Sequence, residues 1–338
     1  MLFWLMFVNL DQDLLIMKIK EFSKENLKFI ELNNGKLCIT LCDLGASVFS
    51  LLLNNKNMIM TPNNVKDFWE AGVYHGKTIG RTGNRIRGNV IEIDGEKFMI
   101  KNNEGPNTLH GGIDGMSTKQ FAYKIIEGKT QTKVEFKYTS KNKESGFPGA
   151  LKTKITYFIS ENTPKFKIKF EAKTTKPTLC NLTNHMFFTL GEASLDCLSL
   201  KVNASNFLEC NSEDLLPIKK SPITRVLDFR KFKKITKDIE KLRFGKANGY
   251  DHNYYFDEIS KKPQVIVKTK DCLLKIKTDF ECCQFYSDNY ANDSIKWVGL
   301  PDGVNRSIAI EPQDDFLNRK VLRPNEKYSH YIQYEFKD

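Results

Sequence analysis

Hydrophobic and polar residues alternate along much of the chain. Between residues 151 and 159, and again between 166 and 172, every second position except Thr153 is apolar, with lysine and threonine largely between these positions. Residues 332–336 repeat the pattern near the end of the chain. Because successive side chains of a strand point to opposite faces, this period of two predicts strands with one buried and one exposed face.

Turn and helix signals complete the pattern. Asp94-Gly95 lies between the two alternating arms of 90–100, and Lys270-Asp271 separates the apolar runs 265–267 and 273–276. Both arrangements are typical of β-hairpins. Helical spacing is weak, and its best example predicts one short connector helix that carries Phe229, Phe232, Ile235, Ile239 and Leu242.

The fold class follows from what the pattern contains and omits. The sequence shows no alternation of strands with helices, no glycine-rich phosphate loop, no repeat of fixed period and no flexible linker. We therefore predict an all-β fold, a large antiparallel β-sandwich with few short helices. It forms a single domain over 17–338, and its loops carry the polar motifs.

The first sixteen residues are treated separately. Met1 to Val8 is apolar, but it lacks the basic region and cleavage site of a signal peptide and is too short to span a bilayer. We interpret residues 1–16 as a non-native or disordered extension, with Met17 as the working start. A short segment that touches a membrane or resembles a signal peptide is the alternative.

Composition and charge exclude some classes of function. The 338 residues are 40% hydrophobic and 28% charged, as in ordinary soluble proteins, and carry a net charge of +11. The lysines are spread over alternate strand positions, which places them on solvated faces, and no nucleic-acid motif accompanies them. No stretch reaches transmembrane length. We expect no nucleic-acid partner, no membrane partner and a cytoplasmic location.

The eight cysteines follow no pattern of a metal site or of a small disulfide framework. They stand at positions 38, 42, 180, 197, 210, 272, 282 and 283, with no pair separated by two residues. Structural zinc is therefore not expected. We interpret all eight as reduced thiols in a reducing compartment.

The histidines give the first indication of chemistry. Four of the five lie in short motifs rich in Asn, Thr and Gly, namely His75, His110, His185 and His252. Histidine has an unperturbed pKa of about 6.5 and exchanges protons near neutral pH. Histidines among small polar residues indicate acid–base chemistry on a hydroxylated substrate.

Three polar motifs allow both a structural and a functional interpretation. The arginines of 80–88 suit substrate hydroxyl oxygens, but they could equally pair with carboxylates. The glycines after His110 could allow close approach of a ligand or could simply form a turn. Asn181, Thr183 and His185 would share one strand face, where burial requires either a ligand or an internal hydrogen-bond network. For this last group we favour the ligand.

Two further motifs add carboxylates. Asp251 and His252 lie between aromatic residues and could be structural partners or could contact a sugar. Glu311 ends an apolar strand, so partial burial could raise its pKa and make it a base near neutrality. An ordinary carboxylate at a strand end is the alternative for Glu311.

Taken together and in order, these segments resemble the aldose 1-epimerase (galactose mutarotase) family. The family's strings are similar to those at 80–86, 105–112, 181–185, 249–253, 284–289 and 311–313. The turn at 146–149 is also similar. The matches extend from about residue 30 to the C-terminus, and the set is specific because six motifs occur in the same order.

The resemblance implies a β-sandwich of the galactose-mutarotase type that interconverts the α and β anomers of free hexoses without cofactor or metal. By this resemblance His185 is the general acid, Glu311 the general base, and His110 orients the ring oxygen. The same resemblance assigns sugar binding to Asn84, Arg85, Asp251 and Gln284. His75 and His252 are expected to be structural or to support the residues that contact the sugar, and the protein is expected to be a monomer or homodimer.

The chemistry of ring opening is consistent with this resemblance. One group removes the anomeric proton, another protonates the ring oxygen, and closure reverses both transfers, so both groups need pKa values near the working pH. The chain departs from the family at Thr82-Gly83, at 186–188, at Asp288 and at Asp314-Asp315. Two alternatives remain, a hexose-6-phosphate 1-epimerase and a non-catalytic sugar-binding protein. Glycoside hydrolysis is disfavoured because no second catalytic carboxylate is obvious.

Overall fold

The computed structural model describes residues 17–338 except 70–73, 260–261 and 291–292. The predicted all-β fold is confirmed, since the described elements are antiparallel strands joined by loops and short 3-10 helices. The predicted single domain over 17–338 stays a prediction, and the predicted extension at 1–16 lies outside the described residues.

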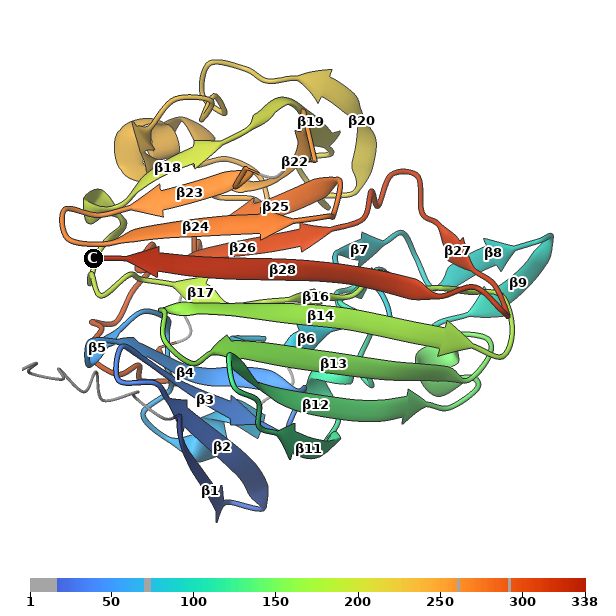
Figure 1. Cartoon of the computed structure of the whole chain (residues 1–338). Helices are drawn as coiled ribbons and strands as arrows, with labels where there is room; N and C mark the ends of the chain where they lie inside the picture. Colours follow the sequence, from blue (N-terminus) through green and yellow to red (C-terminus); the bar gives the residue numbers. More distant parts are fainter. Residues whose placement is uncertain (1–16, 70–73, 260–261, 291–292) are drawn as a thin grey trace, which may run out of the picture.

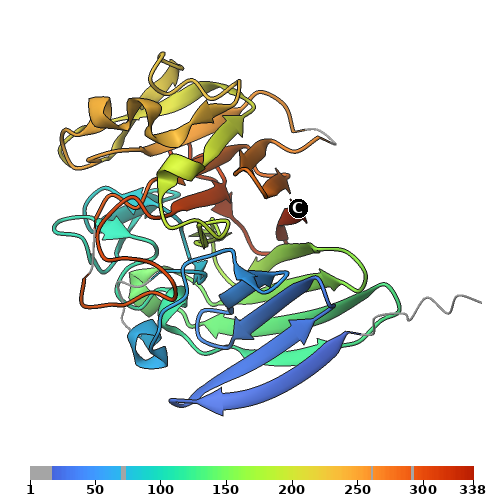
Figure 2. The same ribbon diagram turned by 90° about the vertical axis from the view of Figure 1, so that its left-hand side faces the viewer.

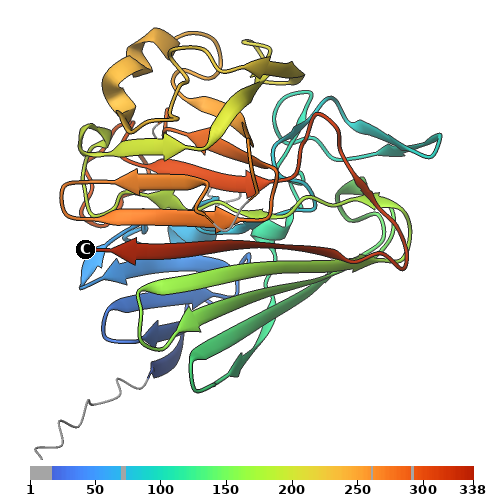
Figure 3. The same ribbon diagram turned by 45° about the horizontal axis from the view of Figure 1, so that its top comes forward.

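The largest sheet has nine strands, and its long central strands run side by side in Figure 1. Figure 3 shows β28, in dark red, between the green strands and the orange ones. In spatial order the strands are β11 (Ala122–Ile126), β12 (Gln131–Ser140), β13 (Leu151–Ser160), β14 (Lys165–Thr174), β28 (Tyr328–Lys337), β24 (Leu273–Thr278), β23 (Val265–Lys268), β18 (Ser199–Val202) and β21 (Lys233–Lys234).

A six-stranded sheet carries Asp251, Gln284 and Glu311 of the site described below. Its order is β17 (Phe187–Phe188), β26 (Ile308–Gln313), β25 (Cys282–Tyr286), β22 (Asp251–Phe256), β19 (Ala204–Cys210) and β20 (Pro217–Pro222). A five-stranded N-terminal sheet contains β1 (Lys18–Lys24), β2 (Leu27–Asn33), β3 (Leu37–Cys42), β4 (Ser47–Leu53) and β5 (Lys56–Asn57). Figure 2 shows this sheet, in blue, at the opposite end of the molecule from the yellow and orange strands.

Short strand pairs and 3-10 helices complete the described part. The pairs are β6 (Thr78–Ile79) with β16 (Thr183–Asn184), β7 (Arg85–Ile86) with β10 (Thr108–Leu109), β8 (Val90–Ile93) with β9 (Glu96–Met99), and β15 (Thr178–Leu179) with β27 (Val321–Leu322). The helices are η1 (Val65–Trp69), η2 (Met116–Thr118), η3 (Glu144–Gly146), η4 (Leu195–Cys197) and η5 (Ile235–Leu242).

The main core receives the inward-facing side chains of all three large sheets. Ile155 comes from the nine-stranded sheet, Ile310 from the six-stranded sheet and Leu41 from the N-terminal sheet, and each is almost completely buried. Alternation along each strand decides which side chains enter the core. On β13, for example, Lys152 and Lys154 point away from it. Burial of these faces holds the sheets against one another.

The local predictions are largely confirmed. Asp94 and Gly95 have φ angles of 53° and 82° at the turn between β8 and β9, and β23 pairs with β24 around Lys270-Asp271. The connector helix differs from its prediction. It is the 3-10 helix η5, which begins at Ile235, so Phe229 and Phe232 precede it. Phe229 is buried in the core, whereas Phe232 is exposed.

Two further findings bear on the sequence analysis. All eight cysteines are free, and most are buried. Among the described residues, no helix is both long enough and apolar enough to cross a membrane.

Candidate active site

The predicted site residues meet in one cavity of about 540 Å³. Its walls include all seven of them: Asn84, Arg85, His110, His185, Asp251, Gln284 and Glu311. They come from segments that are far apart in the chain, so their convergence results from the sheet topology. The structure places these residues together, whereas their individual roles stay predictions.

The six-stranded sheet positions the carboxylate side of the cavity. Gln284 on β25 pairs in register with Glu311 on β26 and with Asn253 on β22. Asp251 lies two residues before Asn253, so it faces the same side of the sheet. The three neighbouring strands β22, β25 and β26 thus present amide and carboxyl groups on the same face of the sheet.

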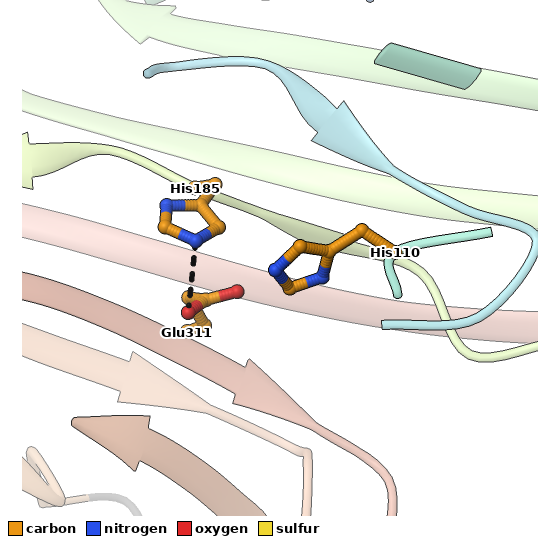
Figure 4. A group of neighbouring side chains, drawn as sticks. All are labelled: His110, His185 and Glu311. Carbon is orange, nitrogen blue, oxygen red and sulfur yellow. Dashed lines mark ion pairs between the residues drawn. The ribbon is translucent and has the colours of Figure 1, made fainter. Parts of the chain in front are cut away.

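His185 lies in the short connection between β16 and β17 and faces Glu311. Its backbone N–H donates to the carbonyl of Lys77 at 3.0 Å, and its own carbonyl accepts from the N–H of Gly76 at 2.8 Å. These two bonds hold the residue in place, and its ring points at Glu311 (Figure 4). The imidazole Nε2 lies 3.3 Å from Glu311 Oε1.

The loop that carries His110 requires a glycine beside the histidine. His110 has a φ of 54°, and Gly111 follows at 88°. A Cβ on Gly111 would lie 2.0 Å from the carbonyl oxygen of Gly80, a distance that no side chain tolerates. The glycines after His110 therefore form a tight turn that allows the backbone of 80–81 to pass close to the histidine.

A backbone hydrogen bond determines which nitrogen of His110 carries the proton. The N–H of Asn84 donates to His110 Nδ1 at 3.2 Å, so Nδ1 is the acceptor and the neutral ring carries its proton on Nε2. Burial, followed by the charges of His185 and Arg85, keeps the pKa of His110 well below its usual value. Neutral His110 therefore carries an Nε2–H group that can donate a hydrogen bond.

Burial controls both members of the His185–Glu311 pair. It lowers the pKa of His185 to about 4. Burial together with the nearby Asp251 raises the pKa of Glu311 well above its usual value, and Arg85 only partly opposes this. Both shifts disfavour the charged forms, so burial favours a neutral pair that shares one proton between Nε2 and Oε1.

Hydrogen bonds and ion pairs order the sugar-binding candidates. Glu104 lies 2.9 Å from Arg85 Nε and 2.9 Å from Lys246 Nζ, and Arg85 also reaches Asp251 at 3.7 Å. The side-chain amide of Asn84 donates to Gln284 at 3.0 Å, and Gln284 in turn donates to Asp251 at 2.5 Å. These contacts fix the orientation of the amide and carboxyl groups before a ligand arrives.

Aromatic rings form another wall of the cavity. Phe187 stacks between His185 at 4.8 Å and His75 at 3.9 Å, measured between ring centroids, and Trp297 lies 4.2 Å beyond His75. Tyr74 contacts His110 edge to face at 4.8 Å. Apolar ring faces beside hydrogen-bonding groups suit the alternating C–H and hydroxyl surfaces of a sugar.

The cluster of His110, His185 and Glu311 also has the spacing of a metal site, since one ligand atom from each lies within 4.8 Å of the others. The hydrogen bond to His110 Nδ1 argues against metal binding by this cluster. With Nδ1 occupied and Nε2 protonated, neutral His110 offers no free lone pair to a metal ion. The donor set fits a sugar oxygen better than it fits a cation.

Some predictions from the polar motifs need correction. Asn181 does not line the cavity, and its side chain exchanges two hydrogen bonds with the backbone of Asp314, at 3.1 and 3.0 Å. Thr183 does not line the cavity either, so His185 alone of the three does. Within the described part of the chain, Arg81 pairs with no carboxylate. It is buried and donates to carbonyl and hydroxyl oxygens of 140–149 and Thr178.

The remaining histidines differ from one another. His252 accepts the backbone N–H of Asp251 at 3.0 Å and does not line the cavity, as expected of a structural residue. His75 lines the cavity, and both of its ring nitrogens are buried without a hydrogen-bond partner in the described structure. Burial, followed by the charge of His185, keeps the pKa of His75 well below its usual value.

Sequence reasoning missed several cavity residues. Glu104, Lys246 and Asp288 are charged, and the rest are aromatic or aliphatic, namely Tyr74, Leu109, Phe187, Tyr286, Tyr290, Ile295 and Trp297. Glu104 could have been found, since it directly precedes the 105–112 motif. The aromatic residues could not, because in sequence they are indistinguishable from core residues.

Comparison with known proteins agrees with the geometry. The family model described as aldose 1-epimerase matches residues 28–335. The chain belongs to the aldose 1-epimerase family. It is 27% identical to the aldose 1-epimerase of Escherichia coli over 340 residues, which cover 90% of this chain and 93% of that protein. It is 25% identical to the galactose mutarotase of Homo sapiens over 327 residues, with the same coverage.

Solved structures share the fold of this aldose 1-epimerase family member. The galactose 1-epimerase of Lactobacillus acidophilus NCFM superposes with a TM-score of 0.84 at 24% identity, covering 96% of this chain and 99% of that one. A GalM/aldose epimerase homologue from C. elegans gives a TM-score of 0.80 at 22% identity, with coverage of 95% and 99%. These likenesses support the fold independently of the sequence motifs.

Proposed function

We propose that this protein is a mutarotase that interconverts the α and β anomers of free aldohexoses such as glucose and galactose. The observation that carries the proposal is the 3.3 Å contact between the buried atoms His185 Nε2 and Glu311 Oε1 in a cavity lined by both polar and aromatic side chains. A buried pair with one shared proton can give a proton to one oxygen and accept a proton from another.

In the proposed reaction, Glu311 and His185 each transfer one proton. With sugar bound, the shared proton moves from Glu311 to His185. Glu311 as carboxylate then accepts the proton of the C1 hydroxyl, and protonated His185 donates its proton to the ring oxygen. The C1–O5 bond breaks and leaves an open-chain aldehyde. Rotation about C1–C2 exposes the other carbonyl face, and the two transfers then run backwards. The Nε2–H of His110 donates a hydrogen bond that orients the ring oxygen. The remaining hydroxyls of the sugar are bound by Asn84, Arg85, Asp251 and Gln284.

Charge in the cavity favours a free sugar over a phosphorylated one. Its walls contain two cations, Arg85 and Lys246, against four carboxyl groups. Both cations are already paired with Glu104, and Arg85 also contacts Asp251. A dianionic phosphate would meet no uncommitted cation among these cavity residues, and its repulsion from the fixed carboxylates would cost binding energy.

The test compares anomerisation of α-D-glucose, α-D-galactose and glucose 6-phosphate by polarimetry or exchange NMR with purified protein. We expect kcat/KM for the free hexoses to exceed that for the phosphate by roughly 100-fold, since like-charge contacts cost several kcal/mol. Glu104→Gln, which releases Lys246 and Arg85, should narrow this ratio. Equal or faster turnover of the phosphate would identify a hexose-phosphate epimerase instead.

The predicted cytoplasmic location, the absence of a nucleic-acid partner and the monomeric or homodimeric state remain predictions. The family relationship supports a sugar as the small-molecule partner. It carries no information on assembly.

A further inference from the structure

Lysines are concentrated in the nine-stranded sheet. Its strands together contain sixteen lysines, three glutamates and no arginine or aspartate. The whole chain has a net charge of +11. This one sheet therefore carries more positive charge than the entire protein, and the remainder has a slight acidic excess.

Strand alternation turns nearly all of these lysines to the outward face, away from the core. On β13, Lys152 is exposed and Lys154 half-buried between the buried side chains Leu151, Thr153 and Ile155. The sequence correctly predicted that such lysines are solvated. It did not show that strands from three separate parts of the chain lie next to one another. The outward lysines of these nine strands form one surface, which we call the lysine face.

The lysine face places like charges opposite one another on neighbouring strands. Lys152 stands opposite Lys173, and Lys137 stands opposite Lys154, in the registers of neighbouring antiparallel strands. Like charges at such positions destabilise a sheet. The fold thus tolerates repulsion that one glutamate on either strand would remove, which is typical of a surface retained for an external partner.

The glutamates of the face are already committed. Glu171 contacts Lys154 at 2.9 Å and Lys327 at 2.6 Å, while Glu135 and Glu335 pair with other lysines of the sheet. By contrast, Lys137, Lys152 and Lys173 form no ion pair with any carboxylate in the part of the chain that the structure describes. Their ammonium groups remain available.

An open hollow of about 360 Å³ lies among these side chains, above the backbone of Thr153 and Ala172. Its charged walls are Lys137, Lys152, Lys154, Lys173, Lys327 and Glu171. Five ammonium groups around one carboxylate make a strongly positive concavity. Such a site suits a group that carries several phosphate oxygens.

We propose that the lysine face docks on an anionic lipid leaflet and that a phosphorylated lipid headgroup occupies the hollow. Nine strands about 4.8 Å apart make a face roughly 40 Å across, which matches a two-dimensional array of headgroups. Lysines near an anionic leaflet attract it additively and without specific geometry. The sequence analysis predicted no membrane partner because no segment could insert, whereas this binding requires no insertion.

A nucleic acid fits the same face less well. The strands contain no arginine for bidentate phosphate contacts. The half-exposed ring of Phe158 is covered by Lys167 at 4.5 Å and Lys133 at 5.5 Å from its centroid, so it offers no platform for base stacking. None of the residues that line the sugar cavity belongs to these strands, so docking would leave the cavity accessible.

The test is co-sedimentation of the full chain with phosphatidylcholine vesicles, with and without phosphatidylserine and phosphatidylinositol bisphosphate, at about 0.1 M salt. We expect binding only to the anionic vesicles. The triple variant Lys137→Gln/Lys152→Gln/Lys173→Gln should weaken it on the order of 100-fold, given the contribution of each lysine at such a surface.

A matched control removes the same charge elsewhere. Lys18→Gln/Lys20→Gln/Lys24→Gln changes three exposed lysines of the edge strand β1 and should weaken vesicle binding by less than about threefold if the lysine face is the contact. Equal losses in both triple variants would overturn the proposal, because binding would then follow net charge alone. No binding to anionic vesicles, or binding of RNA or soluble inositol phosphate in preference to them, would also overturn it.

Discussion

At the scale of single residues, the active site depends on burial more than on unusual residue types. His185 and Glu311 are ordinary acid–base groups, but enclosure shifts both pKa values toward the neutral forms. The tautomer of His110 is set by one backbone N–H. In the proposed mechanism, these features make three common side chains into one proton-transfer unit and one fixed donor.

The pH dependence of turnover follows from the same shifts. His185 has a pKa of about 4, so the pair gains a second proton, and loses its base, only as pH falls through that value. We expect kcat/KM, which reports on the free enzyme, to stay level from neutral pH down to about 5 and then fall. Initial rates of mutarotation measured across this range test the prediction. An acid limb centred near 6.5, the value of an exposed histidine, would contradict it.

Sequence analysis succeeded with the polar residues of the cavity and failed with its apolar ones. A histidine or carboxylate among glycine and asparagine is conspicuous, so His110, His185 and Glu311 could be found. Phe187 and Trp297 could not, because an aromatic residue in a strand or loop resembles a core residue until neighbouring segments are placed. Asn181 misled for a related reason, since its partner is the backbone of Asp314, far away in the sequence.

At the scale of elements, period-two alternation predicted most long strands and both hairpins. It could not predict the pairing order, in which β28 lies between β14 and β24. Pairing between distant segments depends on tertiary packing that no local pattern encodes. The lysine face results from this unpredictable order, and so does the grouping of Asp251, Gln284 and Glu311.

The strand pair β13–β14 offers a test of repulsion within the lysine face. Lys173→Glu places a carboxylate opposite Lys152, so the free energy of unfolding should rise by about 0.2–1 kcal/mol. Urea denaturation of the wild type and the variant measures the change. Lys173→Gln, which only removes the repulsion, should give a smaller gain. A loss of stability in both variants would show that the lysine pair is not under strain.

At the scale of the whole molecule, two functions use different faces of one β-sandwich. The sugar cavity lies over the six-stranded sheet and its loops, and the lysine face is the outward side of the nine-stranded sheet. Because the shared core separates them, charge changes on the lysine face should leave the geometry of the sugar cavity intact. The fold class and the polar residues that line the cavity were predictable from sequence, whereas the distribution of charge over the surface required the three-dimensional arrangement.

The central claim is that His185 and Glu311 act as one proton-transfer unit. The measurement that tests it most directly is polarimetry on freshly dissolved α-D-galactose with the wild type, His185→Asn, Glu311→Gln and the double variant. We predict that the wild type accelerates mutarotation, that each single variant loses on the order of 10²–10⁴ in kcat, and that the double variant loses little more. No acceleration by the wild type, losses below about tenfold, or losses that multiply in the double variant would contradict the claim.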